Sequence, residues 1–189
     1  QLKRAKNFYE YEKRFDESGY DSEEHKRKRL EAGRVFFATY FKSHKEKLTG
    51  KPVRLEQFFR LSLGDMPLIG KIDRIDKITD GYEIIDYKTG SKREQKRVDK
   101  DRQLTIYAMA APFLNLPFSL PVKKLSLYFI EHDVKIETFR TEADFKKEKE
   151  YLIKTIVEIK KAEFPAKPNY PQPCHYCEYN SICPFAKKA

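Results

Sequence analysis

The 189-residue sequence lacks the features that would place it in a membrane or in a secreted, disulfide-bonded fold. No apolar run approaches the roughly 18 residues that a membrane-spanning helix needs, and no secretory signal opens the chain. Only three cysteines occur, all near the C-terminal end, and an odd, clustered set does not suit a disulfide framework. We find no internal repeat and no low-complexity tract. These absences favour a folded, intracellular chain in a reducing compartment.

What the chain has in excess is positive charge and aromatic side chains. Lysine and arginine outnumber the acids by ten, and the pI is about 9.3. A surplus of this size favours a polyanionic partner, of which nucleic acid is the commonest. The alternative is a basic protein without such a partner. Fourteen Phe and twelve Tyr indicate a packed core in one ordinary domain.

The hydrophobic pattern predicts an α/β fold, a central mixed β-sheet flanked by α-helices. Asp80-Gly81 separates two apolar runs, which is a strong hairpin signal. The aromatic residues of the N-terminal helical segment, 1–48, are read as core packing. The predicted elements are strands at 53–63, 68–78, 82–88, 124–131 and 134–141, and helices at 99–113 and 144–163. A core over 52–163 is thus followed by a proline-rich tail, 164–189, within one domain, 1–189.

Two aspartates and a lysine are expected to meet at the hairpin. Asp73 lies on one of its strands and Asp86 on the other, while Lys88 shares a strand face with Asp86. Asp86 follows two isoleucines, where an unpaired carboxylate would be costly to bury. A bound Mg²⁺ removes that cost and needs only one or two protein carboxylates. A lysine beside the metal can orient a water or stabilise developing charge. The two aspartates and the lysine are therefore a minimal set of groups for phosphodiester hydrolysis.

The ordered motifs resemble the RecB-type branch of the PD-(D/E)XK nuclease superfamily, as found behind superfamily 1 helicases of the UvrD/Rep type. The motifs are Gly70-x-x-Asp73-Arg74, Asp86-x-Lys88-Thr89-Gly90 and Gln103-x-x-x-Tyr107. The resemblance covers the chain from about residue 55 to its end. It implies a restriction-endonuclease-like core and metal-dependent cleavage of DNA.

The resemblance also implies roles for individual residues. Asp73 and Asp86 would hold Mg²⁺ or Mn²⁺, helped by the backbone carbonyl of Tyr87, and Lys88 would be the catalytic lysine. The Gln103 and Tyr107 pair would lie on the next helix, near the metal and the DNA. Glu56 resembles an acidic residue of the first strand, with a less defined role.

Each of these residues also has an ordinary structural interpretation. Asp76 is interpreted as a solvated or structural carboxylate. Tyr107 could be an ordinary core residue, and Gln103 could be an exposed polar residue. The family tends to carry a histidine upstream of the first strand. If Gly33 opens the corresponding helix, Phe37 stands where that histidine would be. Some members of such families lose catalysis and act as DNA-binding scaffolds, which is the alternative function.

The tail carries Cys174-x-x-Cys177-x5-Cys183. This spacing brings thiolates onto one metal, and it resembles the last three ligands of the family's 4Fe-4S cluster. Such clusters are usually held by four thiolates, and the fourth cysteine of the family lies upstream of the core. A zinc site completed by His175, a zinc-stabilised protein-interaction domain and an empty tail are the alternatives.

A basic stretch lies between the predicted catalytic strand and the Gln103 helix. Its position favours contact with a phosphate backbone, without reading sequence; a solvated charged loop is the alternative. The predicted DNA-binding side chains are Lys92, Arg93, Lys96, Arg97, Lys100 and Arg102.

Taken together, the sequence predicts a Mg²⁺-dependent deoxyribonuclease, exonuclease or endonuclease, acting on single-stranded DNA or duplex ends in repair or recombination. It contains no Walker-type Gly-Lys-Ser/Thr loop, so a helicase motor is expected elsewhere in a longer protein or in a partner. The chain opens on Gln1 rather than Met, in keeping with a fragment of a helicase-nuclease. We expect a bacterial, cytoplasmic, nucleoid-associated location.

Overall fold

The structure is a computed structural model that describes residues 9–16, 18–47, 50–168 and 173–187. The chain forms two compact units, Gln1–Glu150 and Tyr151–Ala189. The first unit contains the sheet and the candidate site, and the second contains the cysteine tail. No helix in the described ranges is long and apolar enough to cross a membrane.

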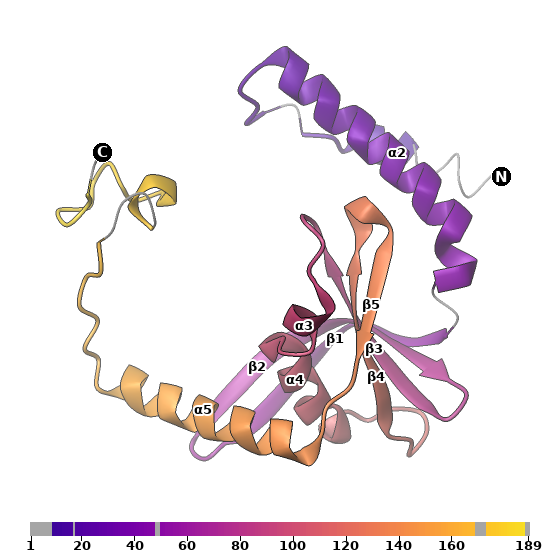
Figure 1. Cartoon of the computed structure of the whole chain (residues 1–189), viewed down its shortest axis with the longest axis vertical. Helices are drawn as coiled ribbons and strands as arrows, with labels where there is room; N and C mark the ends of the chain where they lie inside the picture. Colours follow the sequence, from indigo (N-terminus) through magenta and orange to yellow (C-terminus); the bar gives the residue numbers. More distant parts are fainter. Residues whose placement is uncertain (1–8, 17, 48–49, 169–172, 188–189) are drawn as a thin grey trace. The chain divides into compact units, whose positions relative to one another are not determined.

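The first unit is built on a five-stranded mixed sheet (Figure 1). Its order is β1-β2-β3-β4-β5, with β3 and β4 parallel and the other neighbours antiparallel. The predicted mixed sheet is confirmed, with strand ends shifted by a few residues at most. The strands are β1 (Lys51–Leu63), β2 (Met66–Ile78), β3 (Gly81–Lys88), β4 (Val122–Phe129) and β5 (Val134–Thr138).

Helices join and cover these strands. The stretch 91–102, expected to be a polar loop, contains a one-turn helix, and the helix predicted at 99–113 begins three residues later. The helices are α2 (Glu23–Lys47), α3 (Gln95–Val98), α4 (Arg102–Ala110) and α5 (Glu142–Lys160), with 3-10 turns η1 (Ala111–Phe113), η2 (Ile130–His132) and η3 (Cys174–Tyr176).

The start of α4 is set by Asp101. Its side chain accepts a hydrogen bond from the backbone N–H of Leu104 at 3.0 Å, which satisfies a donor of the first helical turn. Upstream, the short helix α3 is stabilised by contacts with residues distant in the sequence. Val98 is fully buried, and the Gln95 side-chain amide donates to the carbonyl of Glu137. Local pattern therefore does not reveal α3, because tertiary contacts stabilise it.

Two helices cover opposite faces of β3. Ile84 and Asp86 alternate with Ile85 and Tyr87 along the strand, so the two pairs point to opposite sides. On one side, α4 brings Tyr107 to Asp86. On the other, the ring of Tyr40 in α2 stacks on that of Tyr128 in β4, next to Ile85 and Tyr87. Strand β3 is thus buried on both faces.

A buried ion pair lies on the α2 side of the sheet. The Arg74 guanidinium donates to both carboxylate oxygens of Asp76, at 2.6 and 2.8 Å, and it also donates to the Tyr87 hydroxyl at 3.4 Å. Arg74 is 6% exposed and Asp76 is fully buried. Asp76 is therefore a structural carboxylate in this fold, as its context suggested.

Removing one partner of this pair is predicted to destabilise the fold strongly. Arg74→Met leaves the Asp76 charge buried and unpaired, which should lower the free energy of unfolding by about 3–5 kcal/mol. Urea denaturation followed by circular dichroism measures this change. Lys28→Ala removes a solvent-exposed pair with Glu24 and should cost less than about 1 kcal/mol.

The double variant Arg74→Met with Asp76→Leu separates the two explanations of such a loss. It removes both charges together, so it should recover most of the stability that Arg74→Met loses. A double variant no more stable than the single one would show that packing, not charge pairing, is what Arg74 contributes.

Candidate active site

The site lies where two neighbouring strands separate. The ladder between β2 and β3 ends at the pair Arg74↔Ile85. Beyond it, β2 continues to pair with β1 as far as Met66, and β3 continues to pair with β4 as far as Lys88. Asp73 and Asp86 are the first residues past the last shared pair. The hairpin thus brings the two carboxylates to one fork, as predicted.

Asp73 bridges the opening of the fork. Its Oδ2 accepts a hydrogen bond from the backbone N–H of Tyr87 at 2.8 Å, in place of the ladder bond that is lost there. The side chain is half-buried. This contact fixes Asp73 against the peptide bond between Asp86 and Tyr87.

Asp86 is the most enclosed carboxylate of the site, at 2% exposure. Lys88 Nζ lies 2.6 Å from its Oδ2, and the Tyr107 hydroxyl oxygen lies 3.4 Å from its Oδ1. Burial raises the pKa of Asp86, the charge of Lys88 opposes that rise, and the charge of Asp73 adds to it. Two carboxylates and one cation therefore share a poorly solvated volume.

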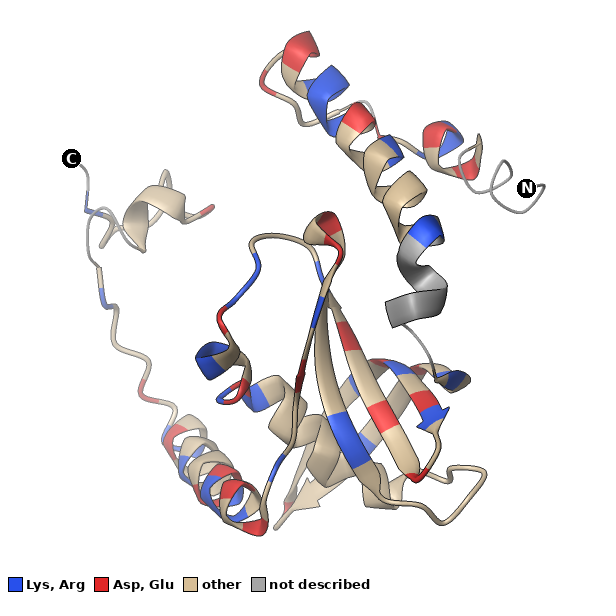
Figure 2. Cartoon of the chain, turned by 45° about the vertical axis from the view of Figure 1, so that its right-hand side comes forward, with Lys and Arg blue, Asp and Glu red and all other residues tan. Residues whose placement is uncertain are grey.

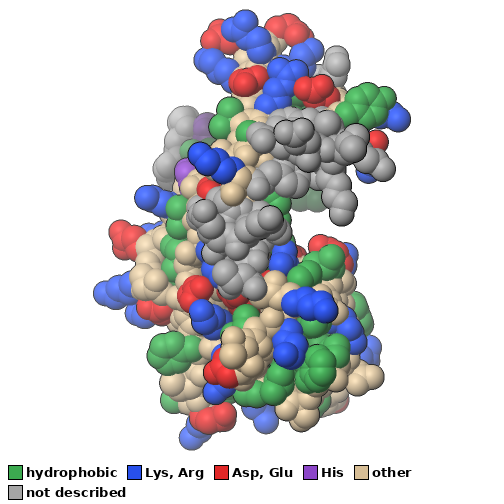
Figure 3. Space-filling model, turned by 90° about the vertical axis from the view of Figure 1, so that its right-hand side faces the viewer, with side chains coloured by type: hydrophobic (Ala, Val, Ile, Leu, Met, Phe, Trp, Pro, Cys, Tyr) green, Lys and Arg blue, Asp and Glu red, His purple; other side chains and the backbone are tan. Residues whose placement is uncertain are grey.

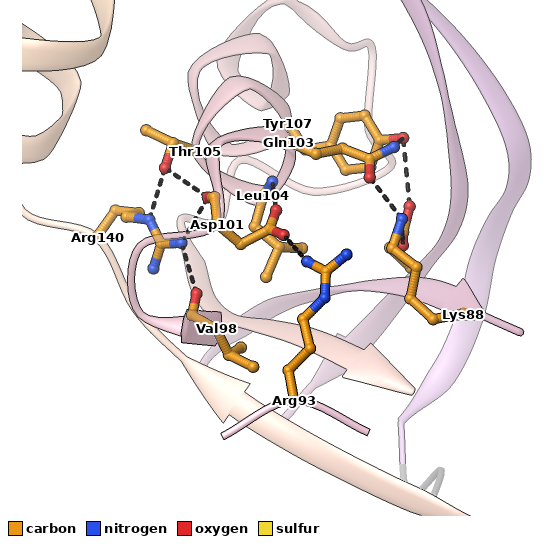
Figure 4. A network of polar contacts seen from close by, with 10 residues as sticks. Lys88, Arg93, Val98, Asp101, Gln103, Leu104, Thr105, Tyr107 and Arg140 are labelled. Atoms are coloured by element: carbon orange, nitrogen blue, oxygen red, sulfur yellow. Dashed lines mark hydrogen bonds and ion pairs between the residues drawn. The ribbon is translucent and has the colours of Figure 1, made fainter. Parts of the chain in front are cut away.

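A chain of polar contacts runs from the fork onto α4 (Figure 4). Lys88 Nζ donates to Gln103 Oε1 at 2.6 Å, and the Gln103 amide donates to the Tyr107 hydroxyl at 2.7 Å. The same hydroxyl lies 2.8 Å from the backbone carbonyl of Lys71 on β2. Burial, with the charge of Asp86, raises the pKa of Tyr107 to about 12, so the phenol stays protonated at neutral pH.

The residues at the fork fit a hard divalent cation. Asp86 Oδ2 is buried and, within the described residues, is assigned no hydrogen bond; its one close charged neighbour is the Lys88 ammonium at 2.6 Å. Such an atom is costly unless a cation completes its environment. No three acidic, histidine or cysteine side chains gather as a ligand set in the described ranges. Mg²⁺ does not require three, because it commonly takes one or two carboxylates and keeps several waters.

Comparison with known proteins assigns the family. The sequence matches the profile of the PD-(D/E)XK nuclease superfamily over residues 2–184, nearly the whole chain. The chain belongs to the PD-(D/E)XK nuclease superfamily. Members of this superfamily are generally nucleases and typically use divalent metals.

A search of solved structures also gives matches. Twenty-seven chains match, among them the one described as "Crystal structure of SSO0001". It is 14% identical, with a TM-score of 0.46, and the alignment covers 98% of this chain and 82% of that one. No curated protein matches.

In this PD-(D/E)XK chain, the predicted site residues converge with one exception. Asp73, Asp86, Lys88, Gln103 and Tyr107 are joined by the contacts described above. Glu56 does not join them. Although the flanking pairs place it opposite Asp73, its carboxylate pairs with Lys71 at 2.6 Å, and its backbone has φ 51°.

The helix upstream of the first strand carries aromatic packing at the position discussed for histidine. Phe37 contacts the rings of Tyr11 and Phe36, with centroids 5.2 and 5.1 Å apart. Gly33 lies against Tyr11, and a Cβ there would overlap its ring. These residues have a packing role in α2.

The predicted basic stretch divides into paired and unpaired side chains. The Arg93 guanidinium lies 2.8 Å from the Asp101 carboxylate. The Arg102 guanidinium donates to both carboxylate oxygens of Glu148, with its shortest contact at 2.7 Å. These two arginines therefore make intramolecular ion pairs while staying partly exposed, and their contact with DNA stays a prediction. The other four members of the predicted DNA-binding set are exposed and have no ion pair within the described part of the chain: Lys92, Lys96, Arg97 and Lys100.

Charge elsewhere on the molecule is mixed in sign. Lys and Arg residues are interspersed with Asp and Glu residues along the ribbons of α2 and α5 (Figure 2), and side chains of both signs are mixed over the described atoms of the face in Figure 3. The surplus of ten positive charges therefore does not by itself define a DNA-binding face. The four basic side chains without an ion pair between β3 and α4 are therefore a better indication of where DNA would bind than the total charge.

Sequence reasoning missed Arg140, which holds the segment leading to the site (Figure 4). Its guanidinium donates to the carbonyls of Val98 and Asp101 at 3.1 and 2.9 Å, and to the Thr105 hydroxyl at 2.7 Å. It thereby ties α3 and the first turn of α4 to the end of β5. No sequence signal marked it, because these three partners lie 35 or more residues away.

Asp86→Asn is predicted to stabilise the metal-free protein and to abolish its stabilisation by metal. Because folding raises the pKa of Asp86, its proton favours the fold at low pH, and that benefit is lost as pH rises through the folded pKa. The variant should therefore melt above the wild type at pH 7, by a margin that shrinks on acidification.

Metal gives the second readout of the same variant. Mn²⁺ or Mg²⁺ at a hundred times its Kd should stabilise the wild type by about 2.7 kcal/mol and leave Asp86→Asn unchanged. Thermal melting with and without metal measures both effects. Equal stabilisation of the two proteins by metal would place the binding site elsewhere.

Proposed function

We propose that this chain is a divalent-metal-dependent deoxyribonuclease domain with its catalytic centre at the fork between β2 and β3. The observation that carries the proposal is the position of Asp73, Asp86 and Lys88 at one fork, where Asp73 binds the Tyr87 N–H and the buried Oδ2 of Asp86 lies 2.6 Å from Lys88 Nζ. Membership of the superfamily supports hydrolysis of DNA as the reaction.

Asp73, Asp86 and the backbone carbonyl of Tyr87 would hold the metal, Mg²⁺ or Mn²⁺. When bound, the ion would polarise the scissile phosphate and lower the pKa of the attacking water. Lys88 would then move from Asp86 towards the reacting phosphate, where its charge stabilises the negative charge that develops. Because Gln103 already contacts Lys88, it would steer the ammonium during that movement. Tyr107 would keep α4 in place through its contact with the Lys71 carbonyl.

Substrate and cellular context follow from the resemblance noted in the sequence. The domain would act on single strands or duplex ends during repair or recombination, coupled to a superfamily 1 helicase in the same or a partner chain. A scaffold that binds DNA without cutting it is the rival function. Phe37, at the position discussed for a family histidine, is the observation that favours the rival.

The cysteine tail would bind a metal only with an additional ligand. Within the second unit, Cys174 is buried, and its Sγ accepts a hydrogen bond from the backbone N–H of Lys187 at 3.4 Å. Cys177 and Cys183 provide two more thiols, one short of the usual set for a 4Fe-4S cluster. A cluster completed by a further cysteine is therefore proposed only for a longer form of the protein.

Nuclease assays on labelled single- and double-stranded DNA test the proposal. In Mg²⁺ or Mn²⁺, the wild type should cut, and Lys88→Ala should lose at least about a hundredfold in rate while remaining folded. Lys149→Ala, an exposed lysine of α5, is the matched control and should cut like the wild type. DNA binding without cleavage by the wild type would instead favour the scaffold.

The unpaired lysines and arginine of the basic stretch are predicted to contact phosphates. Replacing Lys96, Arg97 and Lys100 with Ser should weaken binding of single-stranded DNA. The slope of log affinity against log salt should fall in magnitude by about 2, at roughly 0.7 per lost phosphate contact. Anisotropy titrations between 50 and about 200 mM salt give this slope.

A matched triple variant controls for loss of net charge. Arg27, Lys28 and Arg29 lie on α2, which packs on the sheet face opposite α4. Their replacement with Ser removes the same three charges and should leave the slope nearly unchanged. Equal slopes for the two triple variants would contradict a specific role for the basic stretch.

A further inference from the structure

Past the fork, β1 and β2 form a two-stranded ribbon that β3 no longer accompanies. The pairs run from Gln57↔Ile72 to Leu63↔Met66. Burial alternates along it. Phe59, Leu61 and Leu63 are at most 6% exposed, and Phe59 packs edge-to-face on Tyr107 of α4. One face of the ribbon is therefore part of the core.

The opposite face, which we call the outer face, consists of Phe58, Arg60, Ile69 and Lys71. Phe58 and Ile69 are each 57% exposed, and both basic residues are exposed. The register pairs Phe58 with Lys71 and Arg60 with Ile69. Directly opposed residues have Cβ atoms about 5 Å apart, so each apolar side chain stands beside a cation.

The outer face lies next to the catalytic fork. Lys71 stands two residues before Asp73 on β2, and its backbone carbonyl lies 2.8 Å from the Tyr107 hydroxyl, which is also 3.4 Å from Asp86 Oδ1. The strand rises about 3.4 Å per residue, which places Lys71 roughly 7 Å from Asp73 along β2. A ligand lying along the outer face would therefore lead directly to the proposed metal site.

We propose that the outer face binds the single-stranded part of the DNA substrate, with a base stacked on Phe58 and phosphates held by Arg60 and Lys71. The inference rests on the proposed nuclease function and assigns the substrate form. Aromatic rings interleaved with cations are the usual means of holding single strands, because stacking tolerates any base. A duplex offers no unstacked base to Phe58, so the face selects single strands. Arg60 has no ion pair within the described residues, which leaves its charge available to phosphate.

Glu56 limits this surface at its catalytic end. Its carboxylate lies 2.6 Å from Lys71 Nζ, with both side chains more than half exposed. The Glu56 carboxylate neutralises the charge of Lys71 and places an anion on the path of the single-stranded DNA. Removing the charge of Glu56 should therefore strengthen binding, whereas removing Phe58 should weaken it.

The test is fluorescence anisotropy of the full chain with a labelled oligothymidylate and with a blunt duplex of the same length, in EDTA so that no cleavage occurs. Phe58→Ala should bind the single strand at least about fivefold more weakly and the duplex within twofold of wild type. Phe58→Trp should retain affinity, and Glu56→Gln should gain it. Phe113→Ala, which removes a 72% exposed ring of η1, is the matched control and should change neither affinity.

Three results for Phe58→Ala would overturn the assignment. The first is binding of the single strand with wild-type affinity, and the second is an equal loss of affinity for the single strand and the duplex. In the third result, sedimentation shows that the variant no longer self-associates as the wild type does, while its DNA affinity is unchanged. The last would identify the face as a contact between copies. The proposed function is judged separately by cleavage. If the wild type cuts DNA and Phe58→Ala binds the single strand like the wild type, only the assignment of the outer face is refuted. If the wild type neither binds nor cuts DNA, both proposals are refuted.

Discussion

The burial of the Asp86 carboxylate is the constraint on which the site depends. A charge at 2% exposure is unstable unless cations and donors surround it. Here the ammonium of Lys88 and the hydroxyl of Tyr107 approach it, while one of its oxygens still lacks a hydrogen bond. The burial of this carboxylate costs folding free energy, and under the proposed function a divalent cation would offset that cost. Residues with perturbed pKa values of this kind are common at functional sites.

The fold supports this carboxylate from both faces of one strand. On the α4 side lie Asp86 and Lys88, and on the α2 side the Tyr87 ring contacts Tyr128 and its hydroxyl accepts from Arg74. Packing on one face thus fixes the backbone that presents charges on the other. The Tyr87 N–H, which is bonded to Asp73, couples the two strands at the fork. Precise placement comes from rigid strands rather than from loops.

Features that depend on local pattern could be predicted from the sequence. The alternation of apolar residues and the Asp80-Gly81 turn predict the hairpin, and the hairpin alone brings Asp73 and Asp86 together. Gln103 and Tyr107 were identified only by resemblance, since nothing in their spacing shows that a hydroxyl would reach the Lys71 carbonyl. Whether these residues act in catalysis stays a prediction.

Features that depend on distant partners could not be predicted. The short helix α3 relies on Gln95 reaching Glu137 and on Arg140 reaching Val98. The ion pairs of Arg93 with Asp101 and of Arg102 with Glu148 likewise become visible only when the chain is folded. The outer face of the ribbon requires knowledge of where β3 leaves β2, which the sequence does not mark.

The most direct test of the account is to locate a bound metal. Crystals of the chain grown with Mn²⁺ give an anomalous difference map in which the ion appears independently of any activity. The account predicts a peak at about 2.1 Å from a carboxylate oxygen of Asp73 and of Asp86 and from the Tyr87 carbonyl oxygen, with Lys88 displaced from Asp86. An ion bound elsewhere, with the contact between Lys88 and Asp86 intact, would contradict it.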